Sequence, residues 1–352
     1  MRSKGFIRGS VALCILLMGM YLASCSHNTS PTTGTQTVLI NGAGSTFGYP
    51  IYSRWADDFH KLHPNVEINY QSVGSGAGIR QLLAGTVDFG ASDAPMTDAQ
   101  LAQSKSPILH FPTVLGAVVP TYNIPGITAE LKFTPQALAG IFLGKITKWN
   151  DPAIARTNSG LQLPSAAIVV IHRSDGSGTS FIWTDYLSKV SADWKSKVGS
   201  GTSVNWPVGI GGKGSEGVTG LIQQTPNSIG YVELTYAIQN HILSGVVQNS
   251  SGEFVKASLE SVTAAAASAA GSMPKDFRVS ITNPPGKDAY PIASFTWLLV
   301  PTTIPDAAKR EDIKTFLHWV LTEGQNDAEP LAYAKLPSDV TAKEDATISE
   351  IH

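Results

Sequence analysis

One arrangement occurs three times in this 352-residue chain. An apolar segment typical of a buried β-strand leads into a short run rich in Gly, Ser and Thr, and an amphipathic helix follows. The three runs are residues 42–47, 74–78 and 173–180. Alternation of strand and helix is typical of a parallel α/β sheet, and ligands of open sheets bind outside the carboxyl ends of the strands. The three runs are therefore predicted to converge on one binding site.

The spacing of apolar residues predicts the elements around these runs. Strands are expected at residues 38–40, 66–73, 87–91, 166–171, 229–234 and 291–300. Helices are expected from about residue 50, after residue 78, over residues 133–149, 181–187, 218–224 and 264–270, and after residue 306. A long apolar run at residues 114–122 could carry the chain from one domain to another. Residues 246–255 are predicted to form a surface hairpin.

The run at residues 173–180 has the features of an anion site. A strand that turns through Gly, Ser and Thr into a helix presents free backbone N–H groups at the positive end of the helix dipole. Arg173 adds a fixed fork of donors, and Asp175 is close enough in sequence to hold that fork in place. Ser and Thr are also simply good N-caps. Three such runs in one chain nevertheless favour capture of a small tetrahedral oxyanion.

Asp93 follows the third predicted strand and does not suit a simple anion trap. Its carboxylate would repel an oxyanion unless the ligand carried a proton to donate. Phosphate near neutral pH carries such a proton and sulfate does not, so an acceptor-only group would favour phosphate. The alternative is that Asp93 caps a helix predicted at residues 96–103.

Other ligand and catalytic motifs fail on spacing. No run ends in the Gly-Lys-Ser/Thr of a Walker loop, and residues 42–47 lack the third Gly of the dinucleotide fingerprint. Neither Ser45 nor Ser177 lies in a Gly-x-Ser-x-Gly elbow. His172 neighbours Arg173, but strand alternation points it away, so a structural role is predicted. His residues are scattered and no Cys follows residue 25, so a dedicated metal site is not expected.

The first 25 residues have the features of an export signal. Arg2, Lys4 and Arg8 precede a short apolar run at residues 11–22, and the sequence ending at Cys25 has the form of a lipoprotein cleavage box. The apolar run is shorter than the roughly 20 residues of a membrane span. Cys25 would be the only cysteine left after cleavage, which rules out an intramolecular disulfide and predicts lipid attachment there. The alternative is an ordinary signal peptide with an unrelated cysteine.

Residues 26–37 are polar and aperiodic, and they predict a disordered tether with a reach of roughly 20 Å. The remainder is long enough for two domains, and a content of 42% hydrophobic and 15% charged residues indicates a well-cored protein. Signal cleavage removes three of the 25 Lys and Arg residues, so 22 remain against 27 Asp and Glu, a net charge of −5. A net-acidic body argues against nucleic acid as a partner.

These residues resemble those of a known family, the phosphate-binding lipoproteins or periplasmic components of phosphate ABC transporters (PstS family). The resemblance extends from about residue 39 to residue 340. It is carried by residues 42–47, 87–95, 143–146, 148–149, 175–181, 209–214, 229–233 and 336–337. It implies a type II periplasmic-binding-protein fold, with two α/β lobes joined by two hinge strands around an interdomain cleft. Lobe I is expected at residues 38–122 and 292–352, and lobe II at residues 123–291.

The resemblance also implies the ligand groups. The phosphate-binding residues would be Thr46, Phe47, Ser75, Asp93, Arg173, Ser177, Gly178 and Thr179. In the family pattern Asp93 accepts the phosphate proton, Asp175 holds Arg173, and the residues from Ser177 form a cradle at a helix terminus. The chain departs from its relatives at Ser45, where Ala is common, and at residues 48–49. Neither departure is expected to touch a ligand-binding side chain.

The function implied is capture of inorganic phosphate outside the cytoplasm and its delivery to the permease and ATPase of an ABC transporter. No catalytic residue, metal or cofactor is implied. The chain is expected to be a monomer on the periplasmic or cell-surface face of a bacterial membrane, anchored through Cys25. The alternatives are a binding protein for sulfate, molybdate or another oxyanion, a secreted phosphatase that uses one of the serines, and a surface protein for sensing or adhesion. No general base or metal pair is evident for the phosphatase.

Overall fold

The computed structural model describes residues 37–268 and 273–352, and the chain from Thr37 onward forms one compact unit. The predicted signal peptide, the predicted lipidation site at Cys25 and residues 26–36 of the predicted tether lie outside the described residues. Nowhere in the described ranges does a helix combine the length and the apolar character needed to span a bilayer.

A mixed β-sheet forms the centre of this unit, in the strand order β2-β1-β3-β12-β4-β8-β6-β7, with β9 paired to β4. β1 (Val38–Gly44) pairs in parallel with β2 (Val66–Ser72) and β3 (Phe89–Ser92). β6 (Val169–Arg173) pairs in parallel with β7 (Ile210–Gly212) and β8 (Ser228–Glu233). The sheet predicted to be parallel therefore consists of two parallel groups that antiparallel strands join.

Two antiparallel strands, β12 (Ala293–Pro301) and β4 (Ile108–Asn123), lie between the two groups. β4 pairs with β12 from Ile108 to Ala117 and with β8 from Val118 to Asn123. The apolar run predicted at residues 114–122 thus lies within one long strand that pairs with β12 on one side and with β8 of the second group on the other. The lobe boundaries predicted at residues 122–123 and 291–292 stay predictions.

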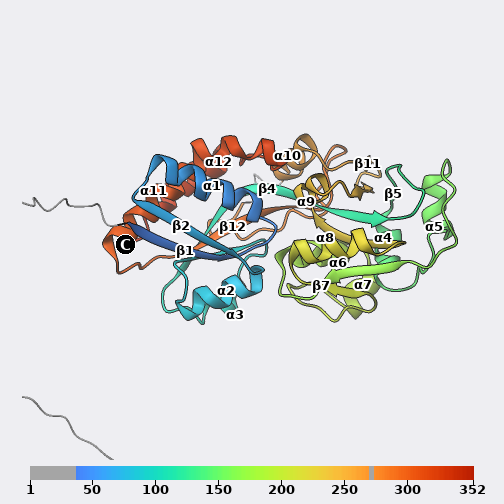
Figure 1. Cartoon of the computed structure of the whole chain (residues 1–352), viewed down its shortest axis with the longest axis horizontal. Coiled ribbons are helices and arrows are strands. Elements are labelled where there is room, and N and C mark those ends of the chain that lie inside the picture. The colour runs from blue at the N-terminus through green and yellow to red at the C-terminus, as the bar shows by residue number, and fades with distance from the viewer. Residues whose placement is uncertain (1–36, 269–272) are drawn as a thin grey trace, which may run out of the picture. The chain divides into compact units, whose positions relative to one another are not determined.

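The first strand group is covered on both faces, with α1 and α11 on one side of β1 and β2 and α2 on the other (Figure 1). Trp55 and Phe59 of α1 and Phe316 of α11 are buried between these helices and the sheet. Apolar residues at helical spacing lie on one face of each helix, and that face packs against the core. The helices of this part are α1 (Tyr49–Leu62), α2 (Ser75–Ala84), α3 (Asp98–Leu101), α11 (Ala307–Leu321) and α12 (Ser338–Ile348), with the 3₁₀ turns η3 (Glu323–Asp327) and η4 (Glu329–Leu331).

The second strand group is packed around an aromatic core in which Trp183 stacks on Tyr231, with ring centroids 5.0 Å apart. Its helices are α4 (Pro135–Phe142), α5 (Pro152–Ala155), α6 (Gly178–Val190), α7 (Ala192–Lys197), α8 (Gly214–Gln224), α9 (Leu234–Gln239) and α10 (Leu259–Ala267), with the 3₁₀ turn η1 (Arg156–Asn158). β5 (Lys132–Phe133), β10 (Val246–Gln248) and β11 (Phe254–Val255) form a small separate sheet, and β9 (Leu243–Ser244) extends the main one.

The predicted hairpin at residues 246–255 is confirmed by the antiparallel pairing of β10 with β11. The helix predicted over residues 133–149 is wrong in length, because α4 ends at Phe142. Gly144 follows with a φ of +69°, a left-handed conformation that closes helices and that Gly adopts without steric cost.

Candidate anion-binding site

The register of the first strand group brings three predicted site residues to one edge of the sheet. Gly44 at the end of β1 lies beside Ser72 of β2 and Ala91 of β3. The chain that leaves each strand carries Thr46, Ser75 and Asp93 respectively. Parallel pairing therefore explains why residues 47 positions apart in sequence lie side by side.

The second strand group supplies the remaining residues in the same way. Arg173, the last residue of β6, pairs with Gly212, the last residue of β7. The helices α6 and α8 begin shortly after these strands, at Gly178 and Gly214. Arg173 thus lies beside the amino-terminal ends of two helices, where the helix dipoles favour negative charge.

The two groups of residues touch each other directly. The hydroxyl oxygens of Thr46 and Ser215 are 2.8 Å apart, and the N–H of Gly76 donates to the carbonyl of Gly176 at 2.8 Å. Gly178 lies against the opposite group, since a methyl group on its Cα would lie 2.6 Å from Ser75 Oγ. All eight residues predicted to bind the ligand lie in this one cluster. They are Thr46, Phe47, Ser75, Asp93, Arg173, Ser177, Gly178 and Thr179, and all are buried.

The Arg173 guanidinium is held as the sequence predicts. Its Nε and Nη2 donate to the two carboxylate oxygens of Asp175, at 2.8 and 2.6 Å. Partial burial favours the neutral acid at Asp175, but the hydrogen bonds and positive charge of Arg173 outweigh it and hold the pKa of Asp175 below its usual range. Arg173 Nη1 lies 3.5 Å from the hydroxyls of Thr179 and Ser215. These two hydrogen bonds of Nη1 are at the long end of the range, so this nitrogen is held less tightly than Nε and Nη2.

Asp93 is fully buried in the cluster. Burial raises the pKa of its carboxyl to about 6, although hydroxyl donors from Ser45 and Thr296 and the positive charge of Arg173 act in the opposite direction. The alternative role as a helix cap is wrong. Thr97 caps α3, which spans only Asp98–Leu101, by accepting the Gln100 N–H in a capping box.

Several buried backbone donors surround the cluster. The N–H groups of Ser75, Gly178 and Thr179 lie in the first turns of α2 and α6, where no intrahelical acceptor exists. The N–H groups of Thr46 and Phe47 donate to no other group in the described ranges. Buried backbone donors in folded proteins are almost always paired. Five of them next to an arginine indicate a compact ligand with several acceptor oxygens.

Ser177 has a second role besides the predicted one. It is the N-cap of α6, and its hydroxyl accepts the backbone N–H of Ser180 at 3.0 Å. Its own N–H donates to the carbonyl of Thr202. The cap fixes where α6 begins and so fixes the direction of the N–H groups that follow.

The sequence analysis did not assign Ser45, Ser215, Tyr236, Tyr333 or Thr296 to the site, although each of them contacts one of the predicted site residues. The expectation that the departure at Ser45 touches no ligand-binding side chain is wrong, since the Ser45 hydroxyl donates to Asp93. Residues 209–214, which help to carry the family resemblance, are the nearest sequence feature to Ser215. Tyr236 and Tyr333 donate to the carbonyls of Thr46 and Phe47, at 2.7 and 2.6 Å, and no local pattern marks them.

His172 has the structural position that strand alternation predicts. Its ring stacks on Trp206 with centroids 4.8 Å apart, and burial lowers its pKa. Across the described ranges, His, Cys, Asp and Glu side chains form no group of three or more that could hold a metal ion.

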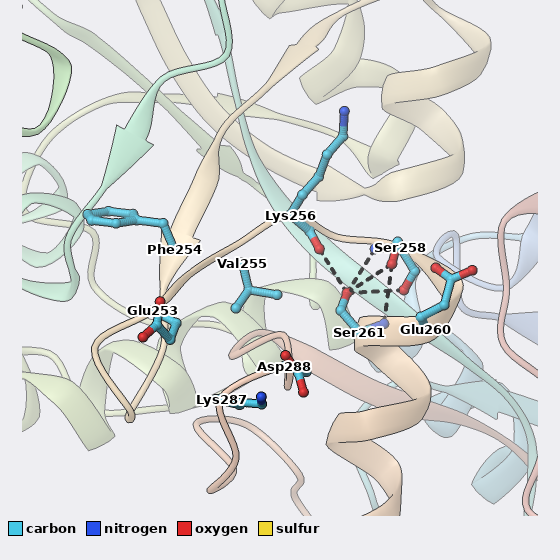
Figure 2. Close-up of a pocket in the computed structure, with 9 residues that line it drawn as sticks. All are labelled: Glu253, Phe254, Val255, Lys256, Ser258, Glu260, Ser261, Lys287 and Asp288. Atoms are coloured by element: carbon cyan, nitrogen blue, oxygen red, sulfur yellow. Dashed lines mark hydrogen bonds between the residues drawn. The ribbon is translucent and has the colours of Figure 1, made fainter.

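A separate open pocket of about 720 Å³ lies at β11, the start of α10 and residues 287–288 (Figure 2). Its lining residues are Glu253, Phe254, Val255, Lys256, Ser258, Glu260, Ser261, Lys287 and Asp288. The hydroxyls of Ser258 and Ser261 are used in the capping box of α10. None of the predicted site residues lines this pocket, so it is distinct from the candidate site.

Comparison with known proteins gives three findings. Residues 29–323 match a family model described as PBP superfamily domain. The chain is 47% identical to the phosphate-binding protein PstS of Xylella fastidiosa, over 91% of this chain and 88% of that protein, and 47% identical to PstS of Pasteurella multocida, over 88% and 89%. A solved high affinity periplasmic phosphate-binding protein (PfluDING) with bound phosphate aligns with a TM-score of 0.70 at 21% identity, over 88% of this chain and 93% of that one.

Proposed function

Because the chain belongs to the PstS family of phosphate-binding proteins, we propose that it binds inorganic phosphate outside the cytoplasm and delivers it to a phosphate ABC transporter. It has the two-lobed α/β fold of periplasmic binding proteins. The division into lobe I at residues 38–122 and 292–352 and lobe II at residues 123–291 is part of the proposal.

The observation that carries the proposal is the convergence of buried donors on Arg173. The N–H groups of Thr46, Phe47, Ser75, Gly178 and Thr179, which have no acceptor among the described residues, come from both strand groups and lie near a guanidinium whose Nη1 makes only long hydrogen bonds of 3.5 Å. A tetrahedral oxyanion has four oxygens with several lone pairs each, enough to accept from all these donors at once. Such charge-assisted hydrogen bonds are the stronger class.

Asp93 selects phosphate among oxyanions in this proposal. Above about pH 6 its carboxyl is ionised and has acceptor capacity only. Phosphate brings an O–H group that donates to it, whereas a fully ionised ligand such as sulfate meets a buried negative charge. A site that rejects the wrong ligand through an unrelieved repulsion discriminates more sharply than one that only attracts the right ligand.

Ligand capture and closure are coupled in the same arrangement. Thr46, Ser75 and Asp93 belong to one strand group, whereas Arg173 and the residues from Ser177 belong to the other. A ligand held by both groups stabilises the closed arrangement of the lobes, because only that arrangement offers all the donors. The closed surface is what the membrane subunits of the transporter would recognise.

The remaining features of the proposal concern the amino terminus and activity. Cys25 carries a lipid, residues 26–37 tether the body to the membrane, and the protein is a monomer that captures and releases phosphate without catalysis. Mass spectrometry of the membrane-bound protein would detect the lipid, and Cys25→Ser would release the protein into the soluble fraction.

Turnover of a phosphate ester by the purified protein would contradict the absence of catalysis.

The decisive experiment is calorimetric titration of the mature protein with phosphate and, separately, with sulfate at pH 8. Phosphate should bind tightly in a one-to-one complex and sulfate should not bind detectably. Absence of phosphate binding would overturn the proposed function, and tight sulfate binding would overturn the role given to Asp93.

A further inference from the structure

The two carboxylate oxygens of Asp93 have different surroundings. Oδ1 receives two hydroxyl hydrogen bonds, one from Ser45 and one from Thr296 at 2.8 Å. Oδ2 has one hydrogen-bond partner among the described residues, the hydroxyl of Ser75 at 3.4 Å. One oxygen is therefore saturated by the protein and the other is not.

The direction of the Ser45 hydrogen bond follows from its second partner. The backbone N–H of Gly48 donates to Ser45 Oγ at 2.9 Å. This interaction uses a lone pair of the hydroxyl, so the hydroxyl hydrogen is free to point at Asp93 Oδ1. Ser45 thus donates to the carboxylate.

The second donor is oriented by a small network of hydroxyl groups. The Thr113 hydroxyl donates to the carbonyl of Thr296 at 3.0 Å. Tyr52 Oη lies 3.0 Å from both Thr113 Oγ1 and Thr296 Oγ1. The hydrogen of Thr113 is used on that carbonyl and the hydrogen of Thr296 on Asp93, so neither threonine donates to Tyr52. Tyr52 donates its single hydrogen to one of these two hydroxyls, and the hydroxyl of Thr296 stays a donor to Asp93 Oδ1.

Asp93 Oδ2 faces the start of α6. A methyl group built on Gly178 would lie 2.6 Å from Oδ2 and 2.6 Å from Ser75 Oγ. This is the side from which the free N–H groups of Gly178 and Thr179 approach. Oδ2 is therefore the oxygen placed to accept a hydrogen bond from the bound anion.

We propose that Ser45, together with Thr296, is a specificity-determining positioning residue: the two hydroxyls hold Asp93 as an ionised, acceptor-only group with Oδ2 turned to the ligand. The inference rests on the proposed function, because it concerns how that site rejects fully ionised oxyanions. Ser45 does not touch the ligand in this account and acts through Asp93 alone.

Among the groups packed around Asp93, the two hydroxyls and Arg173 stabilise its ionised form, and the other titratable groups do not. Tyr52 of α1 and Tyr333 are buried and Tyr70 of β2 is partly buried, and desolvation raises their pKa values, so they are neutral. Glu233 at the end of β8 is also buried, and burial raises its pKa well above the usual range. Arg173 is the nearby charge that favours ionised Asp93.

Loss of a donor to the ionised form raises the pKa of a carboxyl group. Removing the Ser45 hydroxyl should therefore move protonation of Asp93 toward neutral pH. A protonated Asp93 has an O–H group that donates a hydrogen bond to a sulfate oxygen, and it no longer carries the negative charge that repels sulfate. The expected signature is sulfate binding whose pH profile shifts upward, which a merely structural defect would not produce.

The test is calorimetric titration of the mature protein with sulfate and with phosphate between pH 5 and pH 8.5. Ser45→Ala should bind sulfate at least about tenfold more tightly than the unaltered protein at pH 7, which corresponds to an upward shift of about one pH unit in the sulfate profile. The phosphate-to-sulfate affinity ratio should fall by the same factor. Ser72→Ala is the matched control, because it removes a buried hydroxyl that has no hydrogen-bond partner among the described residues.

Thr296→Val and Thr296→Ser provide a second pair, the first without the hydroxyl and the second with it. Val should shift the sulfate profile upward and Ser should restore it, which keeps the inference testable if Ser45→Ala fails to fold. A sulfate profile unchanged in both Ser45→Ala and Thr296→Val would overturn the inference while phosphate binding by the unaltered protein stands. Failure of the unaltered protein to bind phosphate would instead overturn the proposed function.

Discussion

Gly178 lies against Asp93 with no space for a side chain, since a methyl group on its Cα would lie 2.6 Å from Asp93 Oδ2. Gly178 is the first residue of α6, where alanine would otherwise favour the helix. We expect Gly178→Ala to hold the two groups of site residues apart and to weaken phosphate binding by at least about tenfold, a cost of about 1.4 kcal/mol. Calorimetric titration with phosphate measures this loss.

The control for that variant is Gly220→Ala in α8, where a methyl group would meet no atom within 4 Å. Replacing an unhindered helical glycine by alanine stabilises proteins by roughly 0.5–1 kcal/mol. Urea denaturation should show this gain with phosphate affinity unchanged. Full phosphate affinity in Gly178→Ala would contradict the closed arrangement of the site.

Arg173→Ala should weaken phosphate binding more strongly than any other single change in the cluster. The guanidinium is the cation next to the free N–H groups, and its removal also leaves the carboxylate of Asp175 without its two main donors. Loss of a hydrogen-bonded buried charge typically costs roughly 2–5 kcal/mol of binding energy, which is about a 30-fold or greater loss of affinity. Arg173→Lys keeps the charge but not the fork, and should give an intermediate affinity. An affinity for Arg173→Ala within threefold of the unaltered protein would show that the anchor is misplaced.

Tyr333→Phe tests how the free N–H of Phe47 is kept in place. The Tyr333 hydroxyl donates to the Phe47 carbonyl at 2.6 Å, and the ring packs against the Phe47 ring. Phenylalanine keeps the packing but leaves a buried carbonyl unpaired, which should lower the free energy of unfolding by roughly 1–3 kcal/mol. Urea denaturation measures this change. An unaltered unfolding midpoint would mean that the carbonyl finds another donor.

Glu344 in α12 predicts a pH dependence of stability. It is buried, and neither carboxylate oxygen has a hydrogen-bond partner among the described residues. Burial raises its pKa well above the usual value, so the folded protein keeps a proton that the unfolded chain releases. The free energy of unfolding should therefore fall as the pH rises above 4.5, the ordinary pKa of a glutamate side chain, and the fall should end once the folded-state pKa is passed.

Glu344→Leu should remove this decline and raise the free energy of unfolding at pH 8 by roughly 1–3 kcal/mol. Urea denaturation at pH 5 and at pH 8 measures the change. The exposed Glu350→Gln is the control and should alter neither value. Equal effects of the two substitutions would contradict the burial of Glu344.

Local sequence was sufficient for the parts of the site that local geometry builds. Arg173 and Asp175 are two residues apart, and the strand end between them brings the carboxylate to the guanidinium. The strands before Thr46, Ser75 and Asp93 could be predicted from their apolar runs, and parallel pairing then placed their carboxyl ends together. For Asp93, the position at a strand end did not explain its role, which also required the argument that phosphate carries a proton and sulfate does not.

Tertiary packing decided the rest. Ser45 is 48 residues from Asp93 in sequence, and Tyr333 is 286 residues from Phe47, so no pattern within a window of sequence links either pair. The helix predicted through residue 149 ends early because Gly144 takes a left-handed conformation, which composition alone does not distinguish from an ordinary helical glycine. The sequence analysis also missed the mixed direction of the sheet. The antiparallel strands β12 and β4 are strongly apolar, and composition does not distinguish them from parallel strands.

The position of β12 also bears on when this protein can fold. β12 lies between β3 and β4, so the strands β1, β2 and β3 join the rest of the sheet only through residues 293–301. Nearly the whole chain must therefore be synthesised before its amino-terminal part can complete its sheet, and contacts of such long range form slowly. In the proposed function the chain acts outside the cytoplasm, and this order of assembly delays completion of the sheet until residues 293–301 have been synthesised.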